Sequence, residues 1–160
     1  MISSFRHAIA GVTYAVRHER NFRIQLCAAA YVVLFGALAG LETWAWAVCL
    51  ICIGLVLSAE LLNTAVERLC DRVCPEYDRL IRASKDIAAG GVLAVAVLSA
   101  VVGGVVFLRA EIWERLWLLV SGYPWLGVVA VVLLVPCALF VKGRNQLRGG
   151  EAEVEIQKRR

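Results

Sequence analysis

The chain has 160 residues, of which 61% are hydrophobic, and its formal net charge at pH 7 is +4. A soluble domain contains about 45–50% apolar residues, so this composition excludes an ordinary soluble protein and indicates one small integral membrane domain. Residues 1–23 are amphipathic and do not have the apolar core and small-residue cleavage site of a secretory signal. The charge is modest, and no nucleic-acid partner is expected.

Residues 2–18 predict a short amphipathic helix. Their apolar side chains recur at spacings of three and four, which places them on one face of a helix. The residues of this face are Ile2, Phe5, Ile9, Val12 and Val16. A basic helix of this kind either lies in the membrane interface or packs on a helix bundle, and the sequence leaves both arrangements open.

Glu19 is the one acidic residue in a basic segment at residues 17–23. Basic residues that flank a span indicate the cytoplasmic side of a membrane. Glu19 precedes Arg23 by four positions, which is typical of a solvated surface pair on a helix. The local sequence favours that interpretation.

Apolar runs predict four membrane spans, at residues 24–41, from residue 44 through 58, at 87–108 and at 125–141. A span needs about 20 residues to cross the hydrocarbon core. Four spans put both termini on the inside, in agreement with the basic clusters. The expected fold is therefore an all-α integral membrane protein with an amino-terminal amphipathic surface helix, three core transmembrane helices and a fourth at the carboxyl end.

The chain is expected to divide into a membrane core over residues 1–108 and an extra transmembrane helix with a basic cytoplasmic tail over residues 109–160. The segment 109–115 carries balanced charges, as expected of an outer loop. No internal repeat or low-complexity stretch is present.

A polar stripe follows the second apolar run, and one long helix is expected to carry both. At about 100° per residue, its members fall within an arc of roughly 80° on a helix. They are Glu60, Asn63, Glu67 and Asp71. A carboxylate at that depth in a membrane is costly and marks a pathway or a site. Pro75 is expected to end the helix, with a turn at residues 75–78 and a short helical piece after it.

The chemistry of the stripe suits a hard divalent cation. Mg²⁺ prefers one or two carboxylates together with substrate phosphates, and phosphoryl transfer needs positioning, charge neutralisation and an acceptor for the hydroxyl proton. Glu67 with a second acid would hold the metal, Lys85 would neutralise phosphate, and Glu60 would act as base toward a hydroxyl arriving from the lipid. The same acids fit a cation- or proton-coupled transporter, so the residues alone leave two functions open. No phosphate-binding loop or protein-kinase motif set is present.

The six cysteines lie mostly within apolar runs. Cys49 and Cys52 have the spacing of a redox motif, and Cys70 and Cys74 have the spacing of a metal pair. No second cysteine pair or histidine group completes a tetrahedral site. Packing as small polarizable membrane residues is the favoured interpretation.

The spacing of the stripe and its surroundings resembles the small prokaryotic diacylglycerol kinase family, which includes the undecaprenol kinases of Gram-positive bacteria. The similarity covers roughly residues 5–108. The residues that carry it are Gly11, Tyr14-Ala15, Glu19-Arg20-Asn21, Arg23, Glu60-x-x-Asn63-x-x-x-Glu67-x-x-x-Asp71, Pro75-Glu76-Tyr77 and Ala83-x-Lys85-Asp86-x-Ala88-Ala89-Gly90.

The resemblance implies a homotrimer of three transmembrane helices and one amphipathic helix per subunit. It implies transfer of the ATP γ-phosphate, with Mg²⁺, to a lipid alcohol at the cytoplasmic side of the bacterial cell membrane. Glu60 then matches the catalytic base at the substrate, and Glu19 and Glu67 match the metal ligands, which reverses the surface-pair interpretation of Glu19. The matching nucleotide-binding set is His7, Glu19, Glu67, Glu76, Tyr77, Asp78, Lys85 and Asp86.

Other positions shape the expected site. Asn63 and Asp71 match polar residues that line it, and subunits of the family share the site, so Glu19 is expected to act on a neighbouring subunit's stripe. Ala89, in the expected substrate site, stands where some members carry serine, and a hydroxyl contact is lost there. The segments 20–24 and 74–77 look closer to the Gram-positive type, which favours undecaprenol over diacylglycerol as the acceptor.

Overall fold

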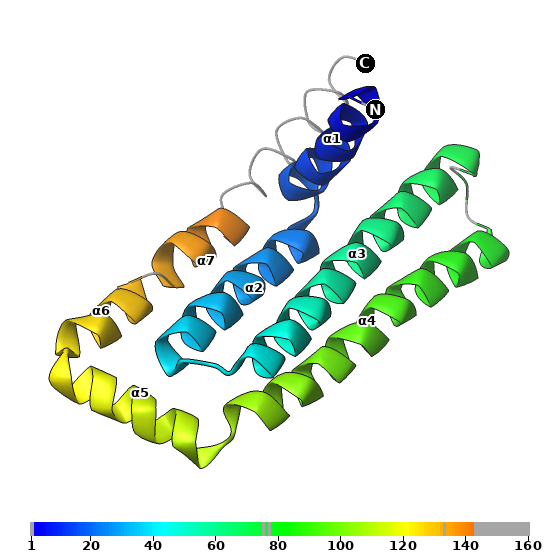
Figure 1. Ribbon diagram of the computed structural model, residues 1–160. Coiled ribbons are helices and arrows are strands. Elements are labelled where there is room, and N and C mark those ends of the chain that lie inside the picture. The colour runs from blue at the N-terminus through cyan, green and yellow to red at the C-terminus, as the bar shows by residue number, and fades with distance from the viewer. Residues whose placement is uncertain (1, 75, 77, 133, 143–160) are drawn as a thin grey trace.

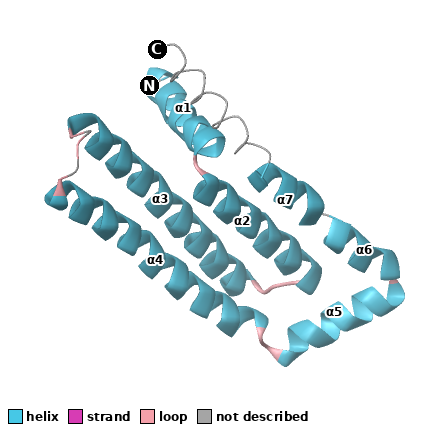
Figure 2. Ribbon diagram, turned by 180° about the vertical axis from the view of Figure 1, so that it is seen from behind, coloured by secondary structure: helices cyan, strands magenta, loops and turns pink. Residues whose placement is uncertain are grey.

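The computed structural model describes residues 2–74, 76, 78–132 and 134–142, and all regular secondary structure among them is helical (Figures 1 and 2). This confirms the predicted all-α class. The helices are α1 (Ile2–His18), α2 (Arg20–Ala39), α3 (Thr43–Val73), α4 (Arg79–Phe107), α5 (Ala110–Gly122), α6 (Pro124–Val132) and α7 (Leu134–Lys142).

Helices α2, α3 and α4 are long and apolar enough to cross a membrane. They run side by side in alternating directions (Figure 1), and their outward surfaces carry exposed apolar side chains such as Leu50, Leu93 and Leu98. In water such surfaces would be a liability, whereas lipid solvates them. The chain is therefore an integral membrane protein, as predicted.

The connection between α2 and α3 is tight because glycines stand where backbone and side chains come close. Gly40 ends α2 in the left-handed conformation, with a φ of 61°, which glycine adopts without steric cost. A Cβ atom at Gly36 would lie 2.9 Å from Leu41 and 3.0 Å from the Trp46 ring. These contacts fix the hairpin that sets α2 against α3.

Helix α3 is 31 residues long. At 1.5 Å per residue it extends roughly 46 Å, well beyond the roughly 30 Å thickness of the hydrocarbon core. Its amino-terminal part therefore spans the membrane while its carboxyl-terminal part, which carries the polar stripe, reaches beyond it. The continuous helix from the second apolar run into the stripe is confirmed.

Helix α4 begins at Arg79, directly after the turn, and continues through Phe107. The separate short helical piece expected after Pro75 is wrong, since this segment is the first part of the long helix. Asp78 caps it: its Oδ1 atom accepts hydrogen bonds from the backbone N–H groups of Leu80 at 2.7 Å and Ile81 at 3.0 Å. A capped start lets the helix form immediately after the turn.

The carboxyl-terminal region differs from expectation. The segment expected as an outer loop is helix α5, and Arg115 on this helix donates a hydrogen bond to the Gly40 carbonyl at 3.2 Å. A fourth span over residues 125–141 is not confirmed: the described residues of this segment form α6 and α7, and residue 133 between them lies outside the described residues. Pro136 lies in the first turn of α7, where its missing N–H removes no intrahelical bond. The predicted basic tail after residue 142 lies outside the described residues.

Candidate active site

The predicted stripe on α3 passes from buried to exposed along the helix. Glu60 has 4% of its surface exposed and Asn63 is also buried. Glu67 is half-buried, and the Asp71 side chain is 64% exposed. The stripe thus leads from the apolar interior of the bundle to the water-exposed end of α3.

Gln25 on α2 contacts Glu60, the deepest member of the stripe. Its Nε2 atom donates a hydrogen bond to Glu60 Oε2 at 3.0 Å, and its Oε1 atom is buried without a partner. The Gln25 oxygen next to the buried carboxylate is thus a hydrogen-bond acceptor that has no donor among the described residues. Sequence reasoning missed Gln25, although an amide in the apolar run 24–41 was a signal for it.

Asn63 and Glu67 form the next pair along the stripe. The Asn63 Nδ2 atom donates to Glu67 Oε1 at 2.9 Å, and the Asn63 Oδ1 atom is buried with no hydrogen-bond partner. An orphaned amide oxygen beside a carboxylate is the kind of hard-oxygen set that Mg²⁺ prefers. In the described part of the chain, no group of three or more His, Cys, Asp or Glu side chains is arranged to hold a metal ion. The donors that are present fit a magnesium ion whose remaining ligands are phosphate and water.

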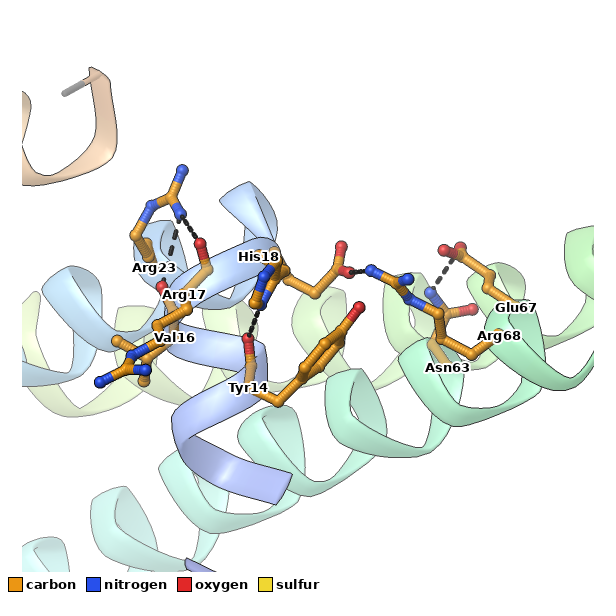
Figure 3. Close-up of polar contacts among 9 residues, drawn as sticks. Tyr14, Val16, Arg17, His18, Arg23, Asn63, Glu67 and Arg68 are labelled. Atoms are coloured by element: carbon orange, nitrogen blue, oxygen red, sulfur yellow. Dashed lines mark hydrogen bonds and ion pairs between the residues drawn. The ribbon is translucent and has the colours of Figure 1, made fainter. Parts of the chain in front are cut away.

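Glu19 lies at the corner between α1 and α2 and faces α3. Its Oε1 atom is 3.5 Å from Nη2 of Arg68, whose guanidinium also lies 4.7 Å from the centre of the Tyr14 ring. Figure 3 shows Arg68 between Tyr14 and the Asn63–Glu67 pair. The carboxylates of Glu19 and Glu67 both lie within electrostatic reach of Glu60. Glu19 thus faces the stripe of its own subunit, and its expected action on a neighbouring subunit's stripe stays a prediction.

The interpretation of Glu19 as a surface partner of Arg23 is wrong. Glu19 has extended backbone angles (φ −104°, ψ 116°) and precedes the first residue of α2, so the two side chains do not share a helix face. Arg23 is instead buried among backbone carbonyl groups.

The exposed end of the stripe faces the start of α4. Asp71 and Lys85 form an ion pair, and the Lys85 ammonium is within electrostatic reach of Glu67. A cation so placed fits the neutralisation of phosphate oxygens. Glu76 is exposed in the connection between the two helices, and Asp78 is the helix cap described above.

Other predicted site residues are not in contact with the cluster. His7 on α1 and Asp86 on α4 are exposed and form no hydrogen bond within the described residues. Ala89 is exposed one turn further along α4. Tyr77 lies outside the described residues.

An apolar cavity of about 330 Å³ lies between α2, α3 and α4, next to Glu60. On α3 it extends from Cys49 to Leu57, and Glu60 follows Leu57 by three residues, or roughly 4.5 Å along the helix. Gln25 lines it as well. The full lining is Gln25, Ala28, Ala29, Val32, Cys49, Cys52, Ile53, Val56, Leu57, Ala96, Ser99, Ala100, Val102, Gly103 and Phe107.

Comparison with known proteins decides the family. The model of the family described as prokaryotic diacylglycerol kinase matches residues 6–107. The chain belongs to this family. It is 40% identical to the undecaprenol kinase of Bacillus subtilis over 105 residues, which cover 66% of this chain and 85% of that protein. It is 42% identical to the diacylglycerol kinase of Synechocystis sp. over 109 residues, 68% of this chain and 62% of that protein.

No solved structure matches the chain significantly. The family match confirms the predicted resemblance and includes every residue predicted for the site. Helices α5, α6 and α7 lie beyond it. The diacylglycerol kinase family assignment therefore applies to the α1–α4 part of the molecule, and the division into domains at residue 108 stays a prediction.

Proposed function

We propose that this protein is an ATP- and Mg²⁺-dependent lipid kinase that transfers the γ-phosphate to the hydroxyl group of undecaprenol. The observation that carries the proposal is the position of Glu60, a buried carboxylate between an apolar cavity and a charged stripe. A lipid alcohol needs both surroundings at once, because its chain is apolar and its hydroxyl must meet a phosphate. Membership of a lipid kinase family and the names of both relatives support it.

The residues around Glu60 divide the chemistry among them. Glu60 accepts the hydroxyl proton of the acceptor lipid, and Gln25 holds the carboxylate through its Nε2 donor at 3.0 Å. Lys85 places a positive charge near the transferred phosphate. Glu67, with Glu19 and the free Asn63 oxygen, would hold the Mg²⁺ ion, which neutralises phosphate oxygens when bound.

The proposal places the reaction at the cytoplasmic face of the bacterial cell membrane. The basic residues that flank α1 and α2 support this orientation. A homotrimer with shared sites is part of the proposal, supported by the exposed outer face of α4, where Ile87 is 76% exposed. Small residues at the start of that helix favour close helix packing in lipid.

Undecaprenol is favoured over diacylglycerol for two reasons. The undecaprenol kinase relative is matched over more of its length than the diacylglycerol kinase relative. In addition, the cavity runs along three helices, over roughly 16 Å on α4 at 1.5 Å per residue from Ala96 to Phe107. A long groove of this kind suits one extended hydrocarbon chain.

The direct test is phosphate transfer from labelled ATP in mixed micelles, with undecaprenol and diacylglycerol offered separately and Mg²⁺ present. Labelled undecaprenyl phosphate is the expected product. Transfer to diacylglycerol alone would overturn the acceptor and keep the kinase. Transfer to neither lipid would contradict the proposal and favour ATP-independent cation or proton flux, which proteoliposomes would report.

A second test fills the cavity. Gly103 lines it, and a Cβ atom at this position meets nothing within 4 Å, so a leucine side chain can start from this backbone position and occupy part of the cavity. We expect Gly103→Leu to raise the KM for the lipid by about 10-fold or more and to leave the KM for ATP unchanged.

Gly104→Leu is the matched control for the cavity test. It is the neighbouring residue, its Cβ atom would make an ordinary contact of 3.9 Å with Leu108, and it does not line the cavity. Equal effects of the two substitutions on the lipid KM would show that the cavity does not hold the chain.

A further inference from the structure

Arg23 on α2 is a buried cation, with 2% of its surface exposed. Its Nη1 atom donates to the backbone carbonyls of Val16 at 3.4 Å and Arg17 at 3.3 Å, and its Nη2 atom donates to the carbonyl of Val141 at 3.4 Å. The guanidinium thus joins α1 and α7 to α2.

All three acceptors belong to the last turns of helices. Helix α1 ends at His18 and helix α7 at Lys142, and carbonyls in a last turn have no intrahelical partner. They also carry the negative end of the helix dipole, so a cation is favoured there. One side chain of α2 therefore satisfies the carboxyl ends of two other helices.

A second pair of residues also places α7 alongside α2. Helices α2 and α7 are in contact, and the Cys137 side chain lies within electrostatic reach of Cys27. Cys27 lies four residues after Arg23 on α2, and Cys137 lies four residues before Val141 on α7. The two helices therefore run in opposite directions and touch at two successive turns.

The Arg23 contacts bear on the active site through Glu19. Glu19 is the single residue between α1 and α2, so the direction of its carboxylate depends on the angle at which α1 leaves α2. Arg23 is one turn into α2 and binds carbonyls two and three residues before Glu19. It fixes the angle from the inside of the corner.

We propose that Arg23 is a positioning residue and that α7 is part of the active-site scaffold. Arg23 and the Val141 carbonyl hold the corner so that the Glu19 carboxylate faces Arg68 and the acids of α3. The inference rests on the proposed function in one respect, that Glu19 is a magnesium ligand. It assigns a role to the segment that lies beyond the matched family region.

The test compares Arg23→Met with Arg23→Lys in the full-length protein. We expect Arg23→Met to raise the Mg²⁺ concentration for half-maximal phosphate transfer by about 10-fold, as loss of an outer-shell contact does, with the lipid KM unchanged. Arg23→Lys keeps the charge but not the forked donor geometry, so an intermediate shift is expected. It also gives a readable result if Arg23→Met fails to fold.

Arg20→Met is the matched control, because Arg20 is an exposed arginine at the start of the same helix. It removes the same charge and is expected to leave the Mg²⁺ dependence unchanged. If Arg20→Met raised the Mg²⁺ concentration for half-maximal transfer as much as Arg23→Met does, loss of positive charge alone would explain the effect. That result would overturn the proposal.

The contact between α2 and α7 can also be measured without an activity assay, by disulfide cross-linking. Oxidation by dioxygen with a copper–phenanthroline catalyst is expected to join Cys27 to Cys137, and peptide mass spectrometry would measure the yield. Arg23→Met is expected to lower that yield. An unchanged yield, or an unchanged Mg²⁺ dependence in an active protein, would overturn this inference. A wild-type protein that transfers no phosphate would overturn the proposed function instead.

Discussion

Replacing Glu60 with glutamine is expected to abolish phosphate transfer while leaving the fold intact. Turnover should fall by about 10²–10⁴-fold, the contribution of a positioned general base. The new amide still offers an oxygen to Gln25 Nε2, and its NH₂ group would face the Gln25 oxygen that is now buried without a partner. The substitution also removes a negative charge close to two other carboxylates. Thermal stability is therefore expected to stay the same or rise.

The measurement is the initial rate of transfer from labelled ATP, together with a melting curve in detergent. Glu42→Gln is the control, because it makes the same change at the other end of α3, where the side chain is 59% exposed and accepts a hydrogen bond from Trp44. Surface changes of this kind alter the free energy of unfolding by about 0.5 kcal/mol at most, and no loss of activity is expected. If the Glu60→Gln protein transferred phosphate at close to the wild-type rate, Glu60 would not be the catalytic base.

The stripe on α3 was predictable because it lies within one helix. The 3.6-residue period placed Glu60, Asn63 and Glu67 on one face, and depth in an apolar run made them conspicuous. Gln25 was missed because its partner lies 35 residues away on another helix. Local spacing does not report contacts of that kind.

The interpretation of Glu19 as a surface partner of Arg23, which came from local spacing, is wrong for a physical reason. An i, i+4 pair requires both residues in one helix, and the chain bends at Glu19 before α2 starts. The family resemblance gave Glu19 a metal-binding role, and the structure is compatible with that role because it turns the carboxylate toward Arg68. The role itself stays a prediction.

In the carboxyl-terminal region, amino-acid composition did not predict the conformation of the chain. Balanced charges over 109–115 indicated an outer segment but carried no information on its conformation, which is helical. Residues 125–141 are apolar enough for a span, and the described residues there are helical in α6 and α7. Hydrophobicity predicts the solvent of a segment but does not report how its helices are arranged.

Replacing Glu67 with glutamine is expected to weaken Mg²⁺ binding and so to raise the Mg²⁺ requirement more than any other single change. The new side-chain oxygen still accepts the Asn63 Nδ2 hydrogen bond of 2.9 Å, so the local structure is kept and only the charge is lost. Outer-shell partners of metal ligands are worth about 10–100-fold, and loss of a charged ligand should reach the upper end of that range or exceed it. The Mg²⁺ concentration for half-maximal transfer is thus expected to rise by about 100-fold or more.

The measurement is a Mg²⁺ titration of the rate at saturating ATP and lipid. Glu111→Gln is the control, because Glu111 is exposed on α5 and pairs with Arg109 away from the cluster. If Glu67→Gln lowered the maximal rate but left the Mg²⁺ midpoint unchanged, Glu67 would not be a ligand. The Asn63 oxygen, which has no hydrogen-bond partner among the described residues, and the Glu19 carboxylate, which lies within electrostatic reach of Glu60, would then be the donors to test.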